Sequence, residues 1–343
     1  MPRIIECIPN FSEGRDSGII ENIVNAVRTA GEVKVLGCEM GEAAGRTVVT
    51  FAGEAEDVCE AAFRAVKTAG KLIDMRLQHG THPRTGATDV LPLVPVSGIS
   101  MDECVILARR LAERIYRELG IPCNLYGKAA LRPERSKLEA CRKGQYEALA
   151  QRIADPDTRP DFSPESFNDT TARSGICNVG ARDFLIAVNF NLDTKSASIA
   201  NDIACEVRER GRKACAQDGS PLKDASGRQI WIPGPLKGCK AIGWYIDEYG
   251  IAQVSMNITD IAAIPLHAAY EQVCRTASHH GVRVTGTEII GLVPKKALTD
   301  AGKHFLGKEA DDETLIQTAI KAMNFNELAP FNPSSKILEY ALD

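Results

Sequence analysis

Residues 184–212, FLIAVNFNLDTKSASIANDIACEVRERGR, decide the fold of this chain, because a strand pattern gives way there to a helix pattern. The short apolar run 184–190 predicts a strand. The stretch 195–212 predicts a helix, since apolar residues such as Ile199 and Ile203 recur at the spacing of one helix face. This strand and helix restart an order of elements that the chain has already run through once.

The rest of the second half completes that order. Runs 239–246 and 251–258 predict a hairpin, followed by a helix over 265–280 and a strand over 283–287. The first 96 residues show the same order, with strands predicted at 3–9, 33–39, 47–52 and 90–96 and helices at 16–30 and 55–74. The order β-α-β-β-α-β is typical of a ferredoxin-like unit. We therefore predict an α/β (α+β) protein built from two ferredoxin-like βαββαβ subdomains.

The region 155–180 separates the two repeats. It carries three prolines among small polar residues and shows little periodicity, which is typical of a linker or a functional loop. We predict an N-terminal subdomain at 1–179 and a C-terminal subdomain at 180–343. Within the second, the segment 216–234 is rich in Gly, Pro and Asp and predicts a surface insert, and the tail 295–343 predicts mostly helix.

Composition excludes several classes of function. Forty-one basic and 45 acidic residues give a net charge of −4 without a basic block, so we expect no nucleic-acid partner. No window approaches the ~18 apolar residues of a membrane span, and the first residues lack the apolar run of a signal peptide. Eleven scattered cysteines without a C-x-x-C pair fit a reducing compartment. We expect a cytoplasmic protein with no membrane partner.

The loop 79–89, HGTHPRTGATD, is where we expect the chemistry. It concentrates two imidazoles, a guanidinium and a carboxylate between a helix and a strand, with no apolar periodicity to explain them. Histidine suits proton transfer near neutral pH, since its ordinary pKa is about 6.5. We therefore predict that His82 is a catalytic base, with Asp89 able to orient a histidine or an arginine.

This loop has two other interpretations. His79 and His82 could form a metal pair, but the helical H-E-x-x-H arrangement is absent and Gly80 and Pro83 indicate a loop, so we expect no metal. His82 could instead be a structural histidine that bonds backbone groups. The charged neighbours Arg84 and Asp89 favour the catalytic interpretation. The polar loops 10–14 and 41–46 are either parts of the same site or plain surface turns.

Several blocks of the sequence resemble the formiminotransferase domain family. They lie at residues 5–14, 46–48, 72–75, 82–84, 125–127, 180–187, 242–245 and 330–333. The resemblance extends from Ile4 to Leu342. It implies the stand-alone form of the domain, without the cyclodeaminase to which the domain is fused in animals. It also implies a homodimer, with folate held in a cleft or tunnel between the two subdomains.

The activity that this family implies is transfer of a formimino group from N-formimino-L-glutamate to N5 of tetrahydrofolate, in histidine degradation. Tetrahydrofolate is then a co-substrate, and no metal is required. Two alternatives stay open. One is formyl transfer from N-formylglutamate to tetrahydrofolate, and the other is a folate-binding protein without catalysis.

The resemblance also implies site residues. The catalytic histidine of the family's His-Pro-Arg motif falls on His82. The folate-binding segment after Pro-Asp-Phe, in which Ser163 replaces the usual Gly, falls on Ser163, Pro164, Glu165, Ser166, Phe167, Asn168, Asp169, Thr170, Thr171 and Ala172. Candidates for substrate binding are Asn10, Glu39, Arg46, Arg84 and Arg182. Glu39 stands where the animal enzyme has Asp, and arginine forks suit the carboxylates of a glutamate donor. As a base, His82 needs a pKa near 7.

Overall fold

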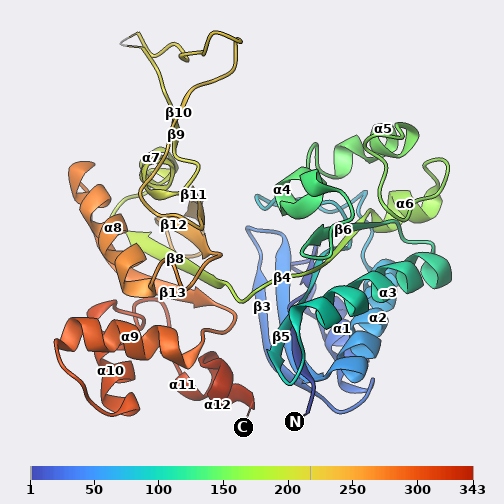
Figure 1. Ribbon diagram of the computed structural model, residues 1–343, viewed down its shortest axis with the longest axis horizontal. Coiled ribbons are helices and arrows are strands. Elements are labelled where there is room, and N and C mark those ends of the chain that lie inside the picture. Colours follow the sequence, from blue (N-terminus) through green and yellow to red (C-terminus); the bar gives the residue numbers. More distant parts are fainter. Residues whose placement is uncertain (1, 217, 343) are drawn as a thin grey trace. The chain divides into compact units, whose positions relative to one another are not determined.

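The structure of the protein is a computed structural model that describes residues 2–216 and 218–342. Contacts divide the chain into two compact units, an N-terminal unit that ends at Asp183 and a C-terminal unit from Phe184 to Ala341. Each unit contains a β-sheet with helices packed on it (Figure 1). No helix among these described residues is long and apolar enough to cross a membrane.

The N-terminal unit begins with the predicted order of elements. Its strands are β1 (Ile4–Cys7), β2 (Asn10–Phe11), β3 (Val33–Gly41), β4 (Arg46–Glu54) and β5 (Thr88–Ser97), and its helices are α1 (Ser17–Arg28) and α2 (Ala55–Leu72). β1 and β2 form one interrupted strand, because each pairs with both β4 and β5. The resulting sheet order, β3-β4-β1/β2-β5, is that of a ferredoxin-like unit, and the predicted fold class is confirmed.

Three further elements widen this sheet. They are α3 (Met101–Leu119), β6 (Cys123–Gly127) and β7 (Cys177–Ala181). β7 lies between β5 and β6 and runs parallel to both. The connection from β6 to β7 contains η1 (Pro133–Ser136), α4 (Leu138–Cys141), η2 (Tyr146–Ala148), α5 (Leu149–Ala154) and α6 (Asp169–Ser174).

The linker interpretation of residues 155–180 was wrong. This region contains α6 and β7, and Phe162 forms a bridge with Cys123, so it belongs to the N-terminal unit. The sequence hid this because its elements are too short to show a period, and tertiary contacts hold them in place. The last part, β7, is buried along its whole length.

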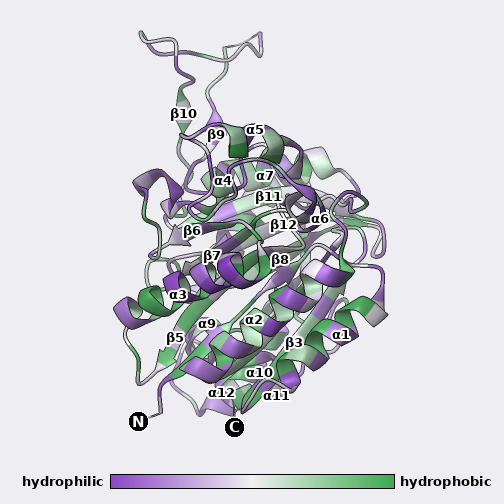
Figure 2. Cartoon of the chain, turned by 90° about the vertical axis from the view of Figure 1, so that its right-hand side faces the viewer, coloured by the Kyte–Doolittle hydropathy of each residue, from purple (hydrophilic) through white to green (hydrophobic). Residues whose placement is uncertain are grey.

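One face of this sheet carries the hydrophobic core. Ile5, Phe51 and Leu91 point from neighbouring strands into the cluster that also contains the buried faces of α1, α2 and α3. Figure 2 shows hydrophilic and hydrophobic segments alternating along these three helices. Full burial of one such side chain contributes about 1.5–3 kcal/mol. Because side chains alternate across a strand, residues between the core positions, such as Glu6, point to the opposite face.

The C-terminal unit repeats the arrangement. Its elements are β8 (Ile186–Leu192), α7 (Ala197–Val207), β11 (Cys239–Ile246), β12 (Ile251–Ile258), α8 (Leu266–His279) and β13 (Val284–Ile290). The sheet order is β11-β12-β8-β13, which again places the first strand between the third and the fourth. The predicted helical tail consists of α9 (Lys295–Leu306), α10 (Asp312–Ala322), α11 (Pro333–Lys336) and α12 (Leu338–Leu342).

The predicted insert at 216–234 lies in an arm of the C-terminal unit. Two short strands, β9 (Arg212–Lys213) and β10 (Trp231–Ile232), pair at the base of the arm. Figure 1 shows the arm projecting away from α7. Its described side chains are mostly exposed, as expected of a surface insert, and residue 217 lies outside the described residues.

Candidate active site

Two loops converge on the predicted catalytic loop 79–89. From the loop after β2, Ser12 donates its Oγ hydrogen to the carbonyl of Gly86 (2.7 Å) and its N–H to that of Ala87 (3.0 Å). From the turn between β3 and β4, the carbonyl of Ala43 accepts from the N–H of Thr81 (3.1 Å). The polar segments 10–14 and 41–46 are therefore parts of one assembly in the N-terminal unit, which the sequence pattern had left open.

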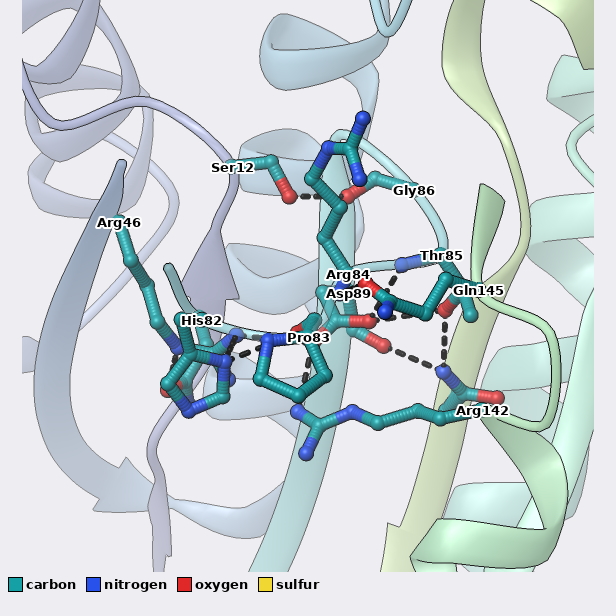
Figure 3. Close-up of polar contacts among 12 residues, drawn as sticks. Ser12, Arg46, His82, Pro83, Arg84, Thr85, Gly86, Asp89, Arg142 and Gln145 are labelled. Carbon is teal, nitrogen blue, oxygen red and sulfur yellow. Dashed lines mark hydrogen bonds and ion pairs between the residues drawn. The ribbon is translucent and has the colours of Figure 1, made fainter. Parts of the chain in front are cut away.

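Asp89 is the centre of this assembly (Figure 3). Its fully buried carboxylate accepts from the N–H and Oγ of Thr85 at one oxygen (2.9 and 2.8 Å). The other oxygen accepts from Arg46 Nη1 (2.9 Å) and Arg142 Nη2 (2.5 Å). Burial alone would raise the pKa of Asp89, but the two guanidinium groups and Thr85 hold it well below its usual range. Asp89 is therefore an ionised carboxylate at neutral pH.

A register shift positions the Asp89 side chain. Asn10 pairs with Val90 and Phe11 pairs with Thr88, which leaves Asp89 as an extra residue between the two pairs. Such an irregularity redirects a side chain locally, and it is common next to functional sites.

Arg46 begins β4 and is held at two points. Its Nε donates to Asn10 Oδ1 (2.8 Å), and its Nη1 donates to Asp89. Burial lowers the pKa of Arg46 to about 10, although Asp89 opposes the shift. The side chain therefore stays cationic at neutral pH. Of the candidates for substrate binding, the structure brings Asn10 and Arg46 together beside His82.

His82 lies against the Arg46 guanidinium. Its Nδ1 is 3.0 Å from Arg46 Nη1 and 2.8 Å from the carbonyl oxygen of Pro83. The guanidinium can only donate and the carbonyl can only accept, so one Nδ1 atom cannot satisfy both. The tautomer with hydrogen on Nδ1 donates to Pro83 and leaves the Nε2 lone pair available as a base.

The surroundings of His82 do not give it the pKa near 7 that a base needs. Burial and the positive charges of Arg46 and Arg142 together lower the pKa of His82 to about 3. The sequence does not indicate this low pKa, because it depends on two guanidinium groups that lie near His82 only in the folded chain. The imidazole is neutral at pH 7 and is a weaker proton acceptor than we expected.

Arg84 points elsewhere. Its Nε donates to the carbonyl of Gln78 (2.9 Å), and its Nη2 pairs with Glu147 (2.8 Å). Its guanidinium also lies over the ring of Tyr146, 5.9 Å from the centroid. These contacts indicate that Arg84 holds the catalytic loop against the segment 145–147.

The two remaining candidates occupy other positions on the same unit. Glu39 lies on β3 opposite Val48 of β4. Arg182 follows β7 and donates to the carbonyl of Asp183 (3.0 Å). Its charge also acts on buried Glu6, whose pKa is raised to about 7 because burial outweighs the attraction of Arg182. Among the described residues, Arg182 shares no hydrogen bond with His82 or Asp89.

The predicted folate-binding segment, Ser163–Ala172, is a loop that leads into α6. Residues 165–170 are exposed, and Asn168 caps the helix by accepting from the N–H of Thr171 (2.9 Å). At the end of the segment, the carbonyl of Ala172 accepts from the hydroxyl of Tyr146. Shortly after it, Gly175 forms a bridge with Gly86 of the catalytic loop. The two segments are therefore neighbours within the N-terminal unit.

The sequence missed two residues of the assembly. Arg142 follows the short helix α4, where a basic residue looks like ordinary surface. Asn178 lies fully buried on β7 and donates to the Asp89 carbonyl (2.7 Å) and to Thr85 Oγ1 (2.8 Å). A polar residue inside the apolar run of β7 was a usable signal for Asn178, but nothing comparable marked Arg142.

No group of three His, Cys, Asp or Glu residues in the described part of the chain could hold a metal ion. His79 is exposed, and its carbonyl accepts from Arg15 (3.2 Å). The assembly itself is cationic. Arg46 and Arg142 share the single negative charge of Asp89, and His82 adds none.

The fold and this assembly define a class of protein: two ferredoxin-like units, one of which carries a neutral histidine inside a cationic site. Family models give the particular family. Residues 4–182 match the N-terminal subdomain of the formiminotransferase domain, and residues 187–343 match the formiminotransferase domain. The chain belongs to the formiminotransferase domain family.

Curated relatives agree with this assignment. The glutamate formimidoyltransferase of Streptococcus pyogenes serotype M1 is 40% identical over 91% of this chain and 96% of its own length. The glutamate formimidoyltransferase of Thermoplasma acidophilum is 39% identical over 90% of this chain and 94% of its own length. The formimidoyltransferase-cyclodeaminase of Gallus gallus is 41% identical over 99% of this chain. The chain spans 60% of the length of that longer relative.

Proposed function

We propose that this protein transfers the formimino group of N-formimino-L-glutamate to N5 of tetrahydrofolate, releasing L-glutamate, in histidine degradation. Membership of the formiminotransferase domain family supports this, as do two glutamate formimidoyltransferases matched over at least 90% of this chain. The observation that carries the proposal is a neutral imidazole set beside a cationic cluster. This arrangement suits a reaction in which an amine loses a proton while it attacks an anionic donor.

In the proposed reaction, His82 is the general base and then the general acid. N5 attacks the formimino carbon of the donor, and a new C–N bond forms as the carbon becomes tetrahedral. Nε2 of His82 takes the proton from N5 and returns it to the nitrogen of the leaving glutamate, whose bond to that carbon breaks. Proton transfer of this kind contributes about 10²–10⁴-fold, and positioning of the two substrates supplies much of the rest.

Binding of the anionic donor would also raise the pKa of His82. A carboxylate within about 4–6 Å favours the protonated form of an imidazole, since opposite charges attract. Binding of the donor near Arg46 and Arg142 would therefore offset the two positive charges that lower the pKa of His82. In this proposal the imidazole becomes a stronger proton acceptor only when the substrate is present.

For tetrahydrofolate we propose the segment Ser163–Ala172. The exposure of residues 165–170 and the bond between Tyr146 and the carbonyl of Ala172 support a ligand-binding loop beside the catalytic loop. Glu39 and Arg182 stay predictions for substrate binding. The absence of a required metal, the homodimer and the cytoplasmic location are also predictions.

The test is a direct assay of the purified chain. With tetrahydrofolate and N-formimino-L-glutamate, we expect 5-formiminotetrahydrofolate and glutamate to form in equal amounts. N-formylglutamate in a parallel assay decides between the two donors. Tight folate binding with no transfer from either donor would instead identify a folate-binding protein without catalysis.

A further inference from the structure

A strained turn, Arg142–Tyr146, lies beside the catalytic loop. Gly144 has φ 75°. Gln145 has φ 56° and ψ −155°, a backbone conformation that is nearly restricted to glycine. A side chain persists in such a conformation only when its surroundings impose it.

The catalytic loop imposes this conformation. The N–H of Tyr146 donates to the carbonyl of Arg84 (2.9 Å), and the N–H of Arg84 faces Gln145 Oε1 (3.4 Å). Within the turn, the N–H of Gln145 donates to the carbonyl of Arg142 (2.8 Å). Arg142 is thereby held at a fixed place next to Asp89.

Arg142 has unused hydrogen-bond donors in that place. Its Nη2 donates to Asp89, but its buried Nε has no acceptor in the part of the chain that the structure describes. A buried guanidinium donor is costly to leave unsatisfied, so Nε of Arg142 points to an acceptor that is supplied by a ligand.

The local charge specifies what kind of acceptor this is. Two guanidinium groups share one oxygen of Asp89 and keep an excess positive charge. Planar guanidinium groups match carboxylates well, because they present several N–H donors in one plane. Since the proposed donor carries two carboxylates, one of them can occupy this position.

We propose that Arg142, together with Arg46 on the other side of Asp89, binds a carboxylate of the glutamate donor. Arg142 is then a specificity-determining residue that the strained turn holds in position. The proposal rests on the proposed function for the identity of the donor. A carboxylate of the folate tail has the same chemistry and is the competing source.

Binding experiments on the full chain test this without requiring transfer. L-Glutamate and tetrahydrofolate are titrated separately into the wild type, R142Q, R142K and K143Q. K143Q is the matched control, because Lys143 is an exposed cation in the same turn. We expect R142Q to weaken L-glutamate binding at least about 10-fold and K143Q to change it less than about 2-fold. Tetrahydrofolate affinity should stay within about 2-fold in every variant.

The variant R142K distinguishes the effect of the planar guanidinium group from the effect of its positive charge. It keeps the positive charge but loses the planar group, so we expect an intermediate loss of glutamate affinity of about 3–10-fold. It also keeps the test valid if R142Q does not fold.

Three results would overturn the proposal. These are no glutamate binding by the wild type, unchanged binding by R142Q, or a loss of tetrahydrofolate affinity alone, which would assign the site to the folate tail. A wild type that binds glutamate but transfers nothing would refute the proposed function and leave the carboxylate site standing.

Discussion

The two ferredoxin-like units have the same topology but differ in their buried polar side chains. In the N-terminal unit, Asp89 balances only one of the two positive charges around it. In the C-terminal unit, buried Gln253 donates to Asn191 (2.8 Å) and Glu288 (3.1 Å) and accepts from Trp244 (3.0 Å). That second network pairs its members with one another. The first network is cationic, whereas the second holds the carboxylate of Glu288 with neutral donors. The contrast teaches that function is carried by the groups placed on a fold and not by the fold itself.

The largest effect should come from Asp89→Asn. This change leaves two buried guanidinium groups without their counter-ion, and removal of one partner from a buried ion pair costs about 3–5 kcal/mol. Urea unfolding measures the loss. The exposed pair Lys296–Asp300 gives the control, because D300N should change stability by no more than about 1 kcal/mol. If D89N and D300N lowered the unfolding free energy equally, Asp89 would not be the buried counter-ion of two guanidinium groups.

His82→Ala should lower turnover by at least about 10²-fold and leave folding and folate affinity largely intact. The reason is that the variant lacks the only proposed base but keeps the cationic cluster. H267A in the C-terminal unit is a control, since His267 stacks on His304 (4.2 Å between ring centroids) and has no proposed role in the reaction. Near wild-type turnover in H82A would refute the role of His82.

Gln253→Ala should lower stability and leave turnover nearly unchanged, which is the opposite of what we expect for H82A. It leaves buried partners without hydrogen bonds, so we expect a loss of about 1–3 kcal/mol in unfolding free energy. Turnover, measured well below the melting temperature, should stay within about 3-fold of the wild type, because Gln253 has no proposed role in the reaction. A folded Q253A protein with strongly reduced turnover would show that the C-terminal unit contributes to catalysis.

The smallest expected effect is on the pH dependence of kcat/KM and kcat. Because the pKa of His82 is about 3, kcat/KM, which reports the free enzyme, should not fall through protonation of His82 between pH 7 and 5. The acid limb of kcat should lie at higher pH, since bound donor raises the pKa of His82. Coincident acid limbs near pH 6.5 in both profiles would contradict the charge environment of His82.

Stability should follow the same titration. The folded-state pKa of His82 lies below the ordinary value of 6.5, so the unfolded chain binds this proton first as the pH falls. The contribution of neutral His82 is fully present above about pH 6.5 and is lost progressively toward pH 3. H82Q should flatten the dependence of unfolding free energy on pH in that window.

The sequence predicted the fold well because long elements leave periodic patterns. The spacing of Ile199 and Ile203 and the alternation of short strands were enough to find both repeats. For residues 155–180, interpreted as a linker or a functional loop, the linker alternative was wrong, because α6 and β7 are too short to show a period. Their structure depends on partners that are distant in the sequence, such as Cys123 for Phe162.

The site was predictable in part. The loop 79–89 stood out because it concentrates polar chemistry, and the resemblance added Asn10 and Arg46, which the structure places beside His82. Arg142 could not be predicted from the sequence. It reaches Asp89 from a turn whose conformation depends on contacts with the catalytic loop. The sequence could not predict the lowered pKa of His82 for the same reason, since that pKa depends on Arg142 and Arg46 being close in space.

The register shift at Asp89 has a consequence for how such a site can arise. β5 carries one residue more than its partner between the pairs Asn10–Val90 and Phe11–Thr88. Removal of that single residue would restore a regular ladder and leave the hydrophobic face of the sheet in place. A single extra residue in one strand is thus what places a buried anion between the two arginines.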